Sequence, residues 1–297
     1  AQKVIRENLA EKTHALLAID WTAAELKEAA QKWLDTMEDG AANKEAAKAY
    51  IAALEESICD GCDCDACKLA SEILSQKDYL SKKSVWIFGG DGWAYDIGFG
   101  GVDHVLAQNE DVNIFVFDTE VYSNTGGQAS KASNIGQVAQ FAAAGKETKK
   151  KSLAEIAMSY GYIYVAQVAM GANQAQTLKA IAEAEAYHGP SLIIGYAPCE
   201  MHSIKGGMMH CQEEMKKAVD CGYWNMFRFD PSKETGKFTL DSKQPKGGYQ
   251  EFLMNEARYS RLTREFPERA NELFERNEES AKARYEHLLK LVEMYKD

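Results

Sequence analysis

Four short and nearly continuous apolar runs constrain the fold of this 297-residue chain more than any other feature. Apolar runs of this length without alternation indicate strands buried on both faces, as in a parallel sheet that helices cover. Since helical stretches alternate with these runs, the pattern predicts an α/β domain with a parallel sheet flanked by helices. The predicted strands are 84–88, 112–117, 162–168 and 191–196, and the predicted helices are 96–108, 153–160 and 174–187.

Largely helical regions flank this predicted domain. Residues 7–56 are rich in Ala, Glu, Lys and Leu and contain no proline, and we expect the Asp39-Gly40 turn to divide them into a helical hairpin with surface character. The second half of the chain adds a predicted helix at 210–221, a short strand at 226–229 and helices from 249 onward. We divide the chain into a helical segment with a cysteine-rich loop (1–80), the α/β core (81–205), and the remainder of the core with a helical C-terminal extension (206–297).

The composition excludes several classes of function. The 45 acidic residues outnumber the 34 basic ones, and a net charge of −11 argues against nucleic acid as a partner. No apolar run approaches the roughly 20 residues that span a bilayer, and no signal peptide opens the chain, so we expect no membrane partner. The seven cysteines are odd in number and four of them cluster, which fits a secreted disulfide framework badly. We therefore expect a reducing, cytoplasmic location.

Two polar segments follow the first two predicted strands. Residues 89–96 read GGDGWAYD, and residues 118–128 read DTEVYSNTGGQ. Because the carboxyl ends of parallel strands meet at one edge of the sheet, where open α/β sheets bind ligands, both segments are candidates for one site. Gly90 and Gly92 allow the backbone to approach a phosphate closely, and the helix predicted from Asp96 would direct its positive end toward it.

Asp91 lies between these two glycines. A carboxylate repels a diphosphate unless a divalent cation separates them, and Mg²⁺ takes one or two protein carboxylates together with phosphate oxygens. The Thr119 hydroxyl and the Asn124 amide oxygen are suitable neutral ligands. The residues therefore predict a Mg²⁺–diphosphate site, and the alternative is an aspartate and two polar residues in ordinary turns.

In their sequences and their order, the two segments resemble the C-terminal thiamine-diphosphate-binding region of the pyruvate:ferredoxin (flavodoxin) oxidoreductases of the long single-chain type. Gly-Asp-Gly alone is a weak signal, whereas the two long segments together are specific. The resemblance runs from about Ser84 to the C-terminus, and it also includes Cys199, Cys221-Gly222-Tyr223-Trp224, Asp241-Ser242-Lys243 and Tyr259-Ser260. It implies a thiamine-diphosphate-binding fold in an enzyme that oxidatively decarboxylates pyruvate to acetyl-CoA and CO2. Electrons would pass through iron–sulfur clusters to ferredoxin or flavodoxin.

The resemblance also implies roles for individual residues. Mg²⁺ would be held by the Asp91 carboxylate, the Thr119 hydroxyl and the Val121 carbonyl, and Asn124 would face the substrate as the catalytic residue. The residues expected to bind the cofactor are Gly90, Asp91, Gly92, Trp93, Thr119, Glu120, Val121, Tyr122, Ser123 and Asn124.

Cys199 matches the family's last ligand to a [4Fe–4S] cluster near the thiamine, although such a cysteine on its own is more typical of an inert apolar residue. In the family, His-Gly-Ile follows this cysteine after a few residues. Here His202 and Ile204 match, but Ser203 replaces the glycine. We favour a structural role for His202.

Other parts of the family's site lie outside this chain. The remaining three cluster ligands lie upstream, and the glutamate that activates the aminopyrimidine ring and the groups for the pyruvate carboxylate come from other domains. Because these parts are missing, we expect the chain to be part of a longer polypeptide and inactive alone; its start without methionine fits a processed, a shortened or a C-terminal piece equally. The expected partners are the rest of the same polypeptide, pyruvate, coenzyme A, ferredoxin or flavodoxin, and a second copy in a homodimer.

Cys59, Cys62, Cys64 and Cys67 form a separate C-x2-C-x-C-x2-C run. Four thiolates can bind Zn²⁺ or an iron–sulfur cluster, but the single residue between Cys62 and Cys64 is tight for one tetrahedral centre. We expect a loop with free or partly paired thiols, and not the cluster near the thiamine.

Two alternative functions remain open. One is a non-catalytic module on a thiamine-type fold that binds a metal or a partner, and the other is the same machinery acting on another 2-oxoacid.

Overall fold

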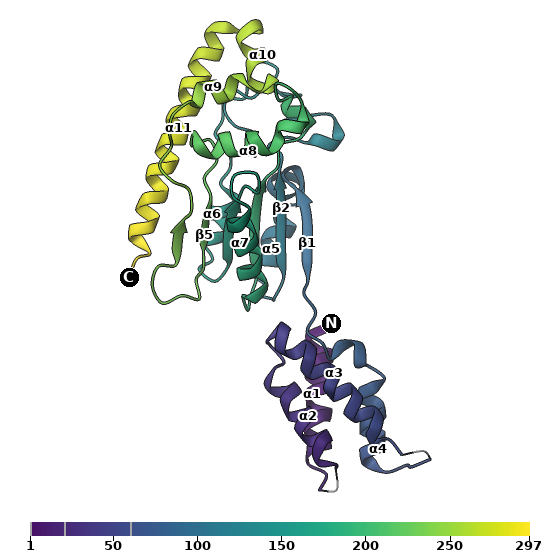
Figure 1. The fold of residues 1–297 in the computed structure, drawn as a ribbon. Coiled ribbons are helices and arrows are strands. Elements are labelled where there is room, and N and C mark those ends of the chain that lie inside the picture. Colours follow the sequence, from purple (N-terminus) through teal and green to yellow (C-terminus); the bar gives the residue numbers. More distant parts are fainter. Residues whose placement is uncertain (1, 21, 60) are drawn as a thin grey trace. The chain divides into compact units, whose positions relative to one another are not determined.

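The computed structural model describes residues 2–20, 22–59 and 61–297, which form two compact units (Figure 1). The N-terminal unit is Ala1–Ser84 and the C-terminal unit is Val85–Asp297. Each unit is described by itself below. In the described part of the chain, every helix is too short or too polar to cross a membrane.

The N-terminal unit packs helices around an apolar core of its own. Trp33 and Tyr50 are fully buried at its centre, with their rings 5.6 Å apart. The buried guanidinium of Arg6 donates to the backbone carbonyls of Met37 and Leu80, which ties the first helix to later parts of the unit. The helices are α1 (Gln2–Leu17), α2 (Ala24–Asp35), α3 (Gly40–Ser57) and α4 (Asp65–Leu74), followed by a 3-10 turn at Lys77–Tyr79.

The predicted helices on either side of the Asp39-Gly40 turn are present as α2 and α3, but the prediction that they have surface character was wrong. Alanine is a small residue that occurs on exposed helix faces as well as in tight helix contacts, so an Ala-rich sequence does not separate the two. Here Ala30, Ala46, Ala47 and Ala70 are at most 1% exposed, and they allow the helices to approach closely.

The C-terminal unit contains the predicted α/β domain. Four parallel strands stand in the order β1-β2-β4-β3, and two antiparallel strands, β5 and β6, extend the sheet beyond β3. The predicted fold class is confirmed, with the predicted strands shifted by at most two residues at their ends. The strands are β1 (Trp86–Gly90), β2 (Asn113–Asp118), β3 (Tyr164–Val168), β4 (Ser191–Tyr196), β5 (Phe227–Phe229) and β6 (Phe238–Leu240).

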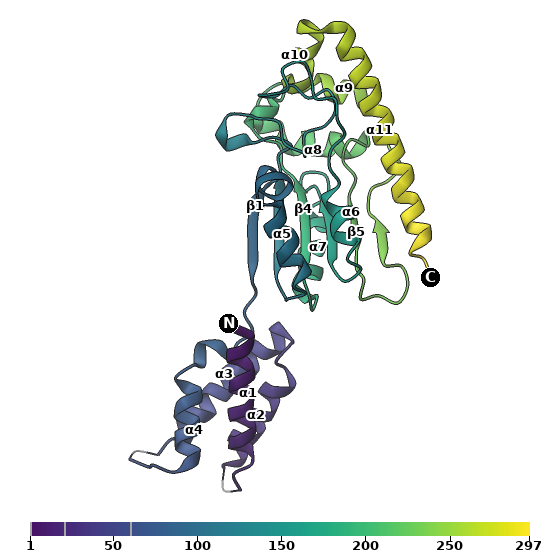
Figure 2. The same ribbon diagram turned by 180° about the vertical axis from the view of Figure 1, so that it is seen from behind.

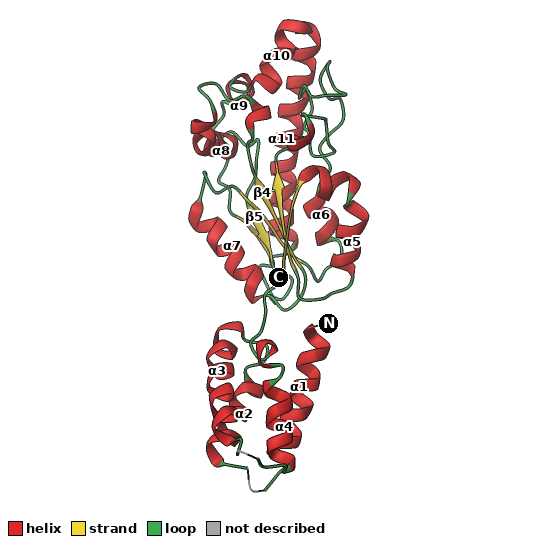
Figure 3. Cartoon of the chain, turned by 90° about the vertical axis from the view of Figure 1, so that its right-hand side faces the viewer, coloured by secondary structure: helices red, strands yellow, loops and turns green. Residues whose placement is uncertain are grey.

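Helices cover both faces of this sheet, as expected for parallel strands (Figure 3). On one face, Ala180 and Ala184 of α7 (Gln174–Ala186) pack against Ala166 and Ile193. The opposite face carries α5 (Phe99–Ala107) and α6 (Leu153–Met158), which Figure 2 shows in front of the strands. Strands buried on both faces explain why their sequences are apolar without alternation.

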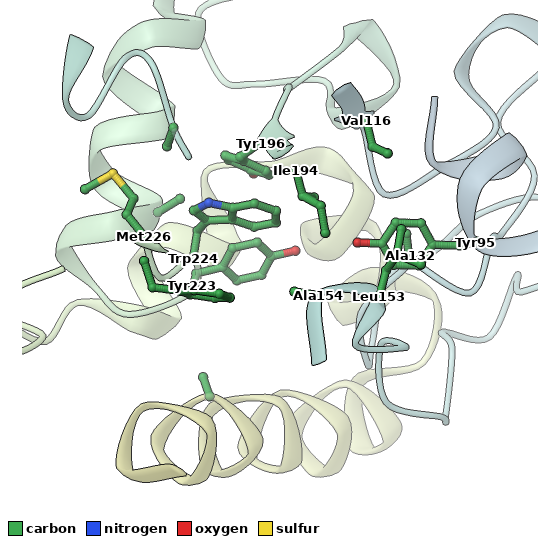
Figure 4. Close-up of a cluster of buried hydrophobic side chains, with 14 of the residues drawn as sticks. Tyr95, Val116, Ala132, Leu153, Ala154, Ile194, Tyr196, Tyr223, Trp224 and Met226 are labelled. Carbon is green, nitrogen blue, oxygen red and sulfur yellow. The ribbon is translucent and has the colours of Figure 1, made fainter. Parts of the chain in front are cut away.

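The segment after β4 adds helices and closes the core. Tyr196 at the end of β4 stacks on Trp224 with ring centroids 5.0 Å apart, and Tyr223 lies beside them (Figure 4). Residues on both sides of position 205 thus share one core, and a boundary there stays a prediction. The strand β6 lies between the predicted strand at 226–229 and the helices predicted from 249 onward, where no strand was predicted. The added helices are α8 (Cys211–Asp220), α9 (Tyr249–Met254), α10 (Ala257–Glu265) and α11 (Pro267–Met294).

Candidate functional site

The two polar segments lie at one edge of the sheet because of the strand register. Gly90 at the end of β1 pairs with Phe117 of the parallel strand β2. Asp91 is therefore the first residue after β1 and Thr119 the first residue after β2, and both lie at the same edge of the sheet. The pairing of Asp118 with Tyr196 brings the end of β4 to the same edge. The segment that contains Cys199 therefore leaves the sheet beside the other two.

Three of the predicted site residues converge through their oxygen atoms. The Thr119 hydroxyl oxygen lies 2.7 Å from Asp91 Oδ1 and 2.8 Å from the carbonyl oxygen of Val121. Ligands about 2.0–2.1 Å from an octahedral Mg²⁺ would be about 2.9 Å apart, close to both separations. The Thr119 backbone N–H also donates to Asp91 Oδ1, at 3.3 Å, but the single hydroxyl proton of Thr119 faces two acceptors. A cation is the natural complement of such a cluster.

Asp91 is 1% exposed. Burial, and then the neighbouring charge of Asp118, raise the pKa of Asp91 to about 6, although hydrogen bonds from Ser130 and Thr119 lower it in part. Ser130 donates to the second carboxylate oxygen at 2.6 Å. A buried carboxylate that is costly to ionise gains from a bound divalent cation, because the cation favours its charged form.

Close packing explains the glycines around Asp91. A Cβ atom on Gly89 would lie 2.2 Å from the Trp93 ring, and one on Gly92 would lie 2.5 Å from the Tyr122 ring. The predicted helix from Asp96 is found in two parts: a π-helical turn at Gly92–Ile97, and then α5. Single π-helical turns occur frequently at functional sites.

Glu120 lies in the loop between Thr119 and Val121, two of the residues whose oxygen atoms converge. It adopts a left-handed conformation with φ 58°, which a non-glycine residue seldom takes. Its fully buried carboxylate accepts hydrogen bonds from Tyr223, Asn134, Lys150 and Arg258 at 2.5–2.9 Å. Burial by itself would raise the pKa of Glu120, but the charges of Lys150 and Arg258 outweigh it and hold the pKa at about 2.

The Glu120 carboxylate thus lies in a buried polar network. Only the backbone of Glu120 remains as part of the loop that was predicted to bind the cofactor. The next residues of this loop form a 3-10 turn at Ser123–Thr125, in which Asn124 is exposed.

The Cys199 segment contacts the same loop. The methyl group of Met201 packs on Gly127, where a Cβ atom would lie 2.2 Å away. The backbone N–H of Cys199 donates to His202 Nδ1 at 3.0 Å, and the Cys199 sulfur lies 3.5 Å from the same nitrogen. Ser203 adopts a left-handed conformation with φ 48°, at the position where the resemblance expects glycine.

Comparisons with known proteins show what the chain is similar to. Residues 67–194 match the family described as thiamine pyrophosphate enzyme, C-terminal TPP binding domain. The chain is 48% identical to a pyruvate-flavodoxin oxidoreductase of Klebsiella pneumoniae, over 98% of this chain and 24% of the relative. It is 52% identical to a pyruvate:ferredoxin oxidoreductase of Moorella thermoacetica, over 91% of this chain and 23% of the relative. The chain is related to the pyruvate:ferredoxin and pyruvate-flavodoxin oxidoreductases.

This relationship confirms the resemblance inferred from the two polar segments. The chain spans about a quarter of the length of these two oxidoreductases. A mitochondrial pyruvate dehydrogenase [NADP(+)] of Euglena gracilis is also 50% identical, over 76% of this chain and 13% of the relative. The names of these relatives share pyruvate but differ in the electron acceptor.

The sequence analysis did not find three residues that position the candidate site. Ser130 bonds Asp91 directly, Lys150 pairs with Asp118 and Glu120 at 2.8 Å each, and Arg258 pairs with Glu120 from α10. Lys150 lies in a basic run that is typical of a solvated surface. Ser130 and Arg258 carry no local signal, because their partners are remote in the chain.

The surroundings of Cys199 indicate whether it could be a ligand to an iron–sulfur cluster. Its side chain is partly buried, and burial raises the pKa of its thiol. Among the described residues, the three-cysteine group with sulfur atoms close together is Cys62, Cys64 and Cys67, and Cys199 is not part of it. A cluster at Cys199 would therefore need its other ligands from outside the described part of this chain.

Proposed function

We propose that this chain carries the Mg²⁺–diphosphate half of the thiamine diphosphate site in an enzyme that oxidatively decarboxylates pyruvate and forms acetyl-CoA and CO2. The convergence of the Asp91, Thr119 and Val121 oxygen atoms carries the proposal. The match to a thiamine pyrophosphate enzyme domain and the names of the relatives support the cofactor and the substrate.

In this proposal, the residues bind and orient the cofactor. Asp91, Thr119 and Val121 would hold Mg²⁺, which would neutralise charge on the diphosphate. Gly90 and Gly92 leave room for the diphosphate beside the backbone. Bound thiamine diphosphate would supply the electron sink that decarboxylation of a 2-oxoacid requires. Trp93 and the loop 119–124 would line the diphosphate side.

Asn124 and Cys199 would serve the later parts of the reaction. Asn124 is exposed in its turn and would face the substrate, and Cys199 would hold one iron of a [4Fe–4S] cluster shared with residues outside this chain. A partly buried cysteine that leaves the sheet beside the diphosphate loop supports this assignment. The remaining partners would be the rest of the polypeptide, coenzyme A, a second copy in a homodimer, and ferredoxin or flavodoxin.

A non-catalytic module on the same fold is the alternative. Such a module would have no use for a buried carboxylate whose pKa is raised to about 6 and which lies beside the Thr119 hydroxyl, itself in contact with the Val121 carbonyl oxygen. The cost of burying Asp91 therefore favours a site that still binds a cation.

Calorimetric titration with thiamine diphosphate tests the proposal. We expect the 297-residue chain to bind the cofactor with Mg²⁺ and to lose binding in EDTA. Asp91→Asn should weaken Mg²⁺-dependent binding at least about tenfold, because loss even of a group that supports a metal ligand costs about 10–100-fold. Asp220→Asn is the control, since Asp220 lies on α8 in an exposed ion pair with Lys246.

Three outcomes would contradict the proposal. They are binding that does not need Mg²⁺, binding that Asp91→Asn leaves unchanged, and no binding by the unaltered chain.

A further inference from the structure

The cysteine-rich loop of the N-terminal unit brings three thiols together. The sulfur atoms of Cys62, Cys64 and Cys67 all lie within 4.8 Å of one another, between the end of α3 and the first turn of α4. The three side chains are exposed, intermediate and buried in that order, so the group extends from solvent into the edge of the unit. Neither the thiamine site nor Cys199 accounts for it.

The backbone of α4 favours a thiolate at this position. Cys64 is the N-cap residue of the ten-residue helix α4. Amide groups at a helix N-terminus stabilise negative charge, and thiolates are the form of cysteine that binds metals.

We propose that Cys62, Cys64 and Cys67 bind one Zn²⁺ ion, with Cys59 as the fourth ligand. Thiolates about 2.3 Å from a tetrahedral Zn²⁺ are about 3.8 Å apart, which small side-chain rotations reach from separations of at most 4.8 Å. Binding releases the protons of those thiols that are protonated, and no oxidation or reduction is involved. The expectation of free or partly paired thiols is the alternative that the experiment must exclude.

The position of Cys59 supports its role as the fourth ligand. The backbone N–H of Cys62 donates to the carbonyl oxygen of Cys59 at 3.2 Å, which holds the Cys59 backbone next to Cys62, although the Cys59 sulfur lies outside the group of three. Its exposed thiol makes a weak contact with the Ser57 carbonyl at 3.9 Å and can rotate away from it.

The proximity of the sulfur atoms favours a single ion. A cluster of four irons spreads its cysteine ligands over several metal atoms, whereas one ion draws them into one small tetrahedron. A disulfide would join two of the sulfur atoms and leave the third beside them without a function. A Zn²⁺ ion uses all three, and it would fasten the loop after α3 to the first turn of α4.

Zn²⁺ and Co²⁺ titrations of the reduced, metal-free 297-residue chain test the proposal. We expect one Zn²⁺ per chain, and with Co²⁺ the thiolate charge-transfer and tetrahedral d–d absorption bands. Cys64→Ser and Cys59→Ser should each weaken Zn²⁺ binding at least tenfold. Cys211→Ser, which changes a lone cysteine of the C-terminal unit, should leave it unchanged.

Circular dichroism of each variant checks that the helices are intact, and the Co²⁺ spectrum of the unaltered chain needs no variant. Less than one Zn²⁺ per reduced chain would overturn the proposal, as would iron with acid-labile sulfide. A disulfide that persists between these cysteines under reducing conditions would overturn it as well. Equal Zn²⁺ affinity in Cys59→Ser would remove Cys59 from the ligand set.

Discussion

At the scale of single residues, the site combines one carboxylate that is costly to ionise with another that is held ionised. The pKa of Asp91 is raised to about 6 by burial and by the charge of Asp118. Glu120 is buried as deeply, but Lys150 and Arg258 pair with it and hold its pKa at about 2. Asp91 is therefore suited to bind a cation that comes from outside the chain. Glu120 is already paired with two cationic side chains of the chain itself, Lys150 and Arg258.

This difference predicts how Asp91→Asn changes stability with pH in the metal-free chain. The unfolded pKa of Asp91 is about 3.8 and its folded pKa is about 6, so the folded chain loses stability as pH rises through this interval. The variant does not. From pH 4 to pH 8, its free energy of unfolding should gain up to about 3 kcal/mol relative to the unaltered chain. Urea denaturation in EDTA measures this difference.

The exposed Asp220→Asn variant is the control, and its difference from the unaltered chain should change less with pH. An Asp91→Asn difference that stays constant from pH 4 to pH 8 would show that burial does not raise the pKa of Asp91.

At the scale of elements, the end of β1 and the π-helical turn leave no room for a larger residue at Gly89, Gly92 and Gly98. The Trp93 ring lies across Gly89 of β1 and across Gly98, where a Cβ atom would lie 2.3 Å from it. The ring thereby fixes the path of the chain on both sides of Asp91. The glycines of this segment serve internal packing as well as access for a phosphate.

Gly89→Ala tests this packing. We expect the substitution to displace the Trp93 ring, to lower the free energy of unfolding by about 1–3 kcal/mol, and to weaken Mg²⁺-dependent cofactor binding. Gly100→Ala is the matched control, because a Cβ atom there meets open space on α5. Alanine in a helix should leave stability unchanged or raise it by up to about 1 kcal/mol. Urea denaturation and calorimetric titration measure both effects, and equal behaviour of the two variants would contradict the packing argument.

At the scale of the whole molecule, the two units have separate apolar cores. Leu54 lies in the core of the N-terminal unit and Leu192 in that of the C-terminal unit, and both are fully buried. Burial of apolar side chains is the main stabilising contribution to folding, so separate cores should unfold as separate cooperative units.

Scanning calorimetry of the 297-residue chain should therefore show two unfolding transitions. Leu54→Ala should lower one of them by roughly 10 °C, since such cavities cost about 2–5 kcal/mol in a unit of this size. Leu192→Ala should lower the other. A single transition that both substitutions shift would mean that the two units unfold together.

Local patterns in the sequence were sufficient to predict the four parallel strands, the edge where Asp91 and Thr119 meet, and the relationship to the oxidoreductases. Burial on both faces produces apolar runs that can be read directly, and parallel strands bring their carboxyl ends together whatever the details of packing. The assignment of Asp91, Thr119 and Val121 to Mg²⁺ depended in addition on the resemblance. The structure places their oxygen atoms together.

Only the tertiary structure decided which polar groups pair inside the core and how the N-terminal unit packs. Arg258 reaches Glu120 across 138 positions of the chain, and no local pattern marks such a pair. The buried alanines of the N-terminal unit resemble surface positions until the helices are placed against one another. The close approach of the sulfur atoms of Cys62, Cys64 and Cys67 depends likewise on where α4 begins. These contacts join residues whose separation is set by the folded chain, whereas strands and turns depend mainly on their neighbours in sequence.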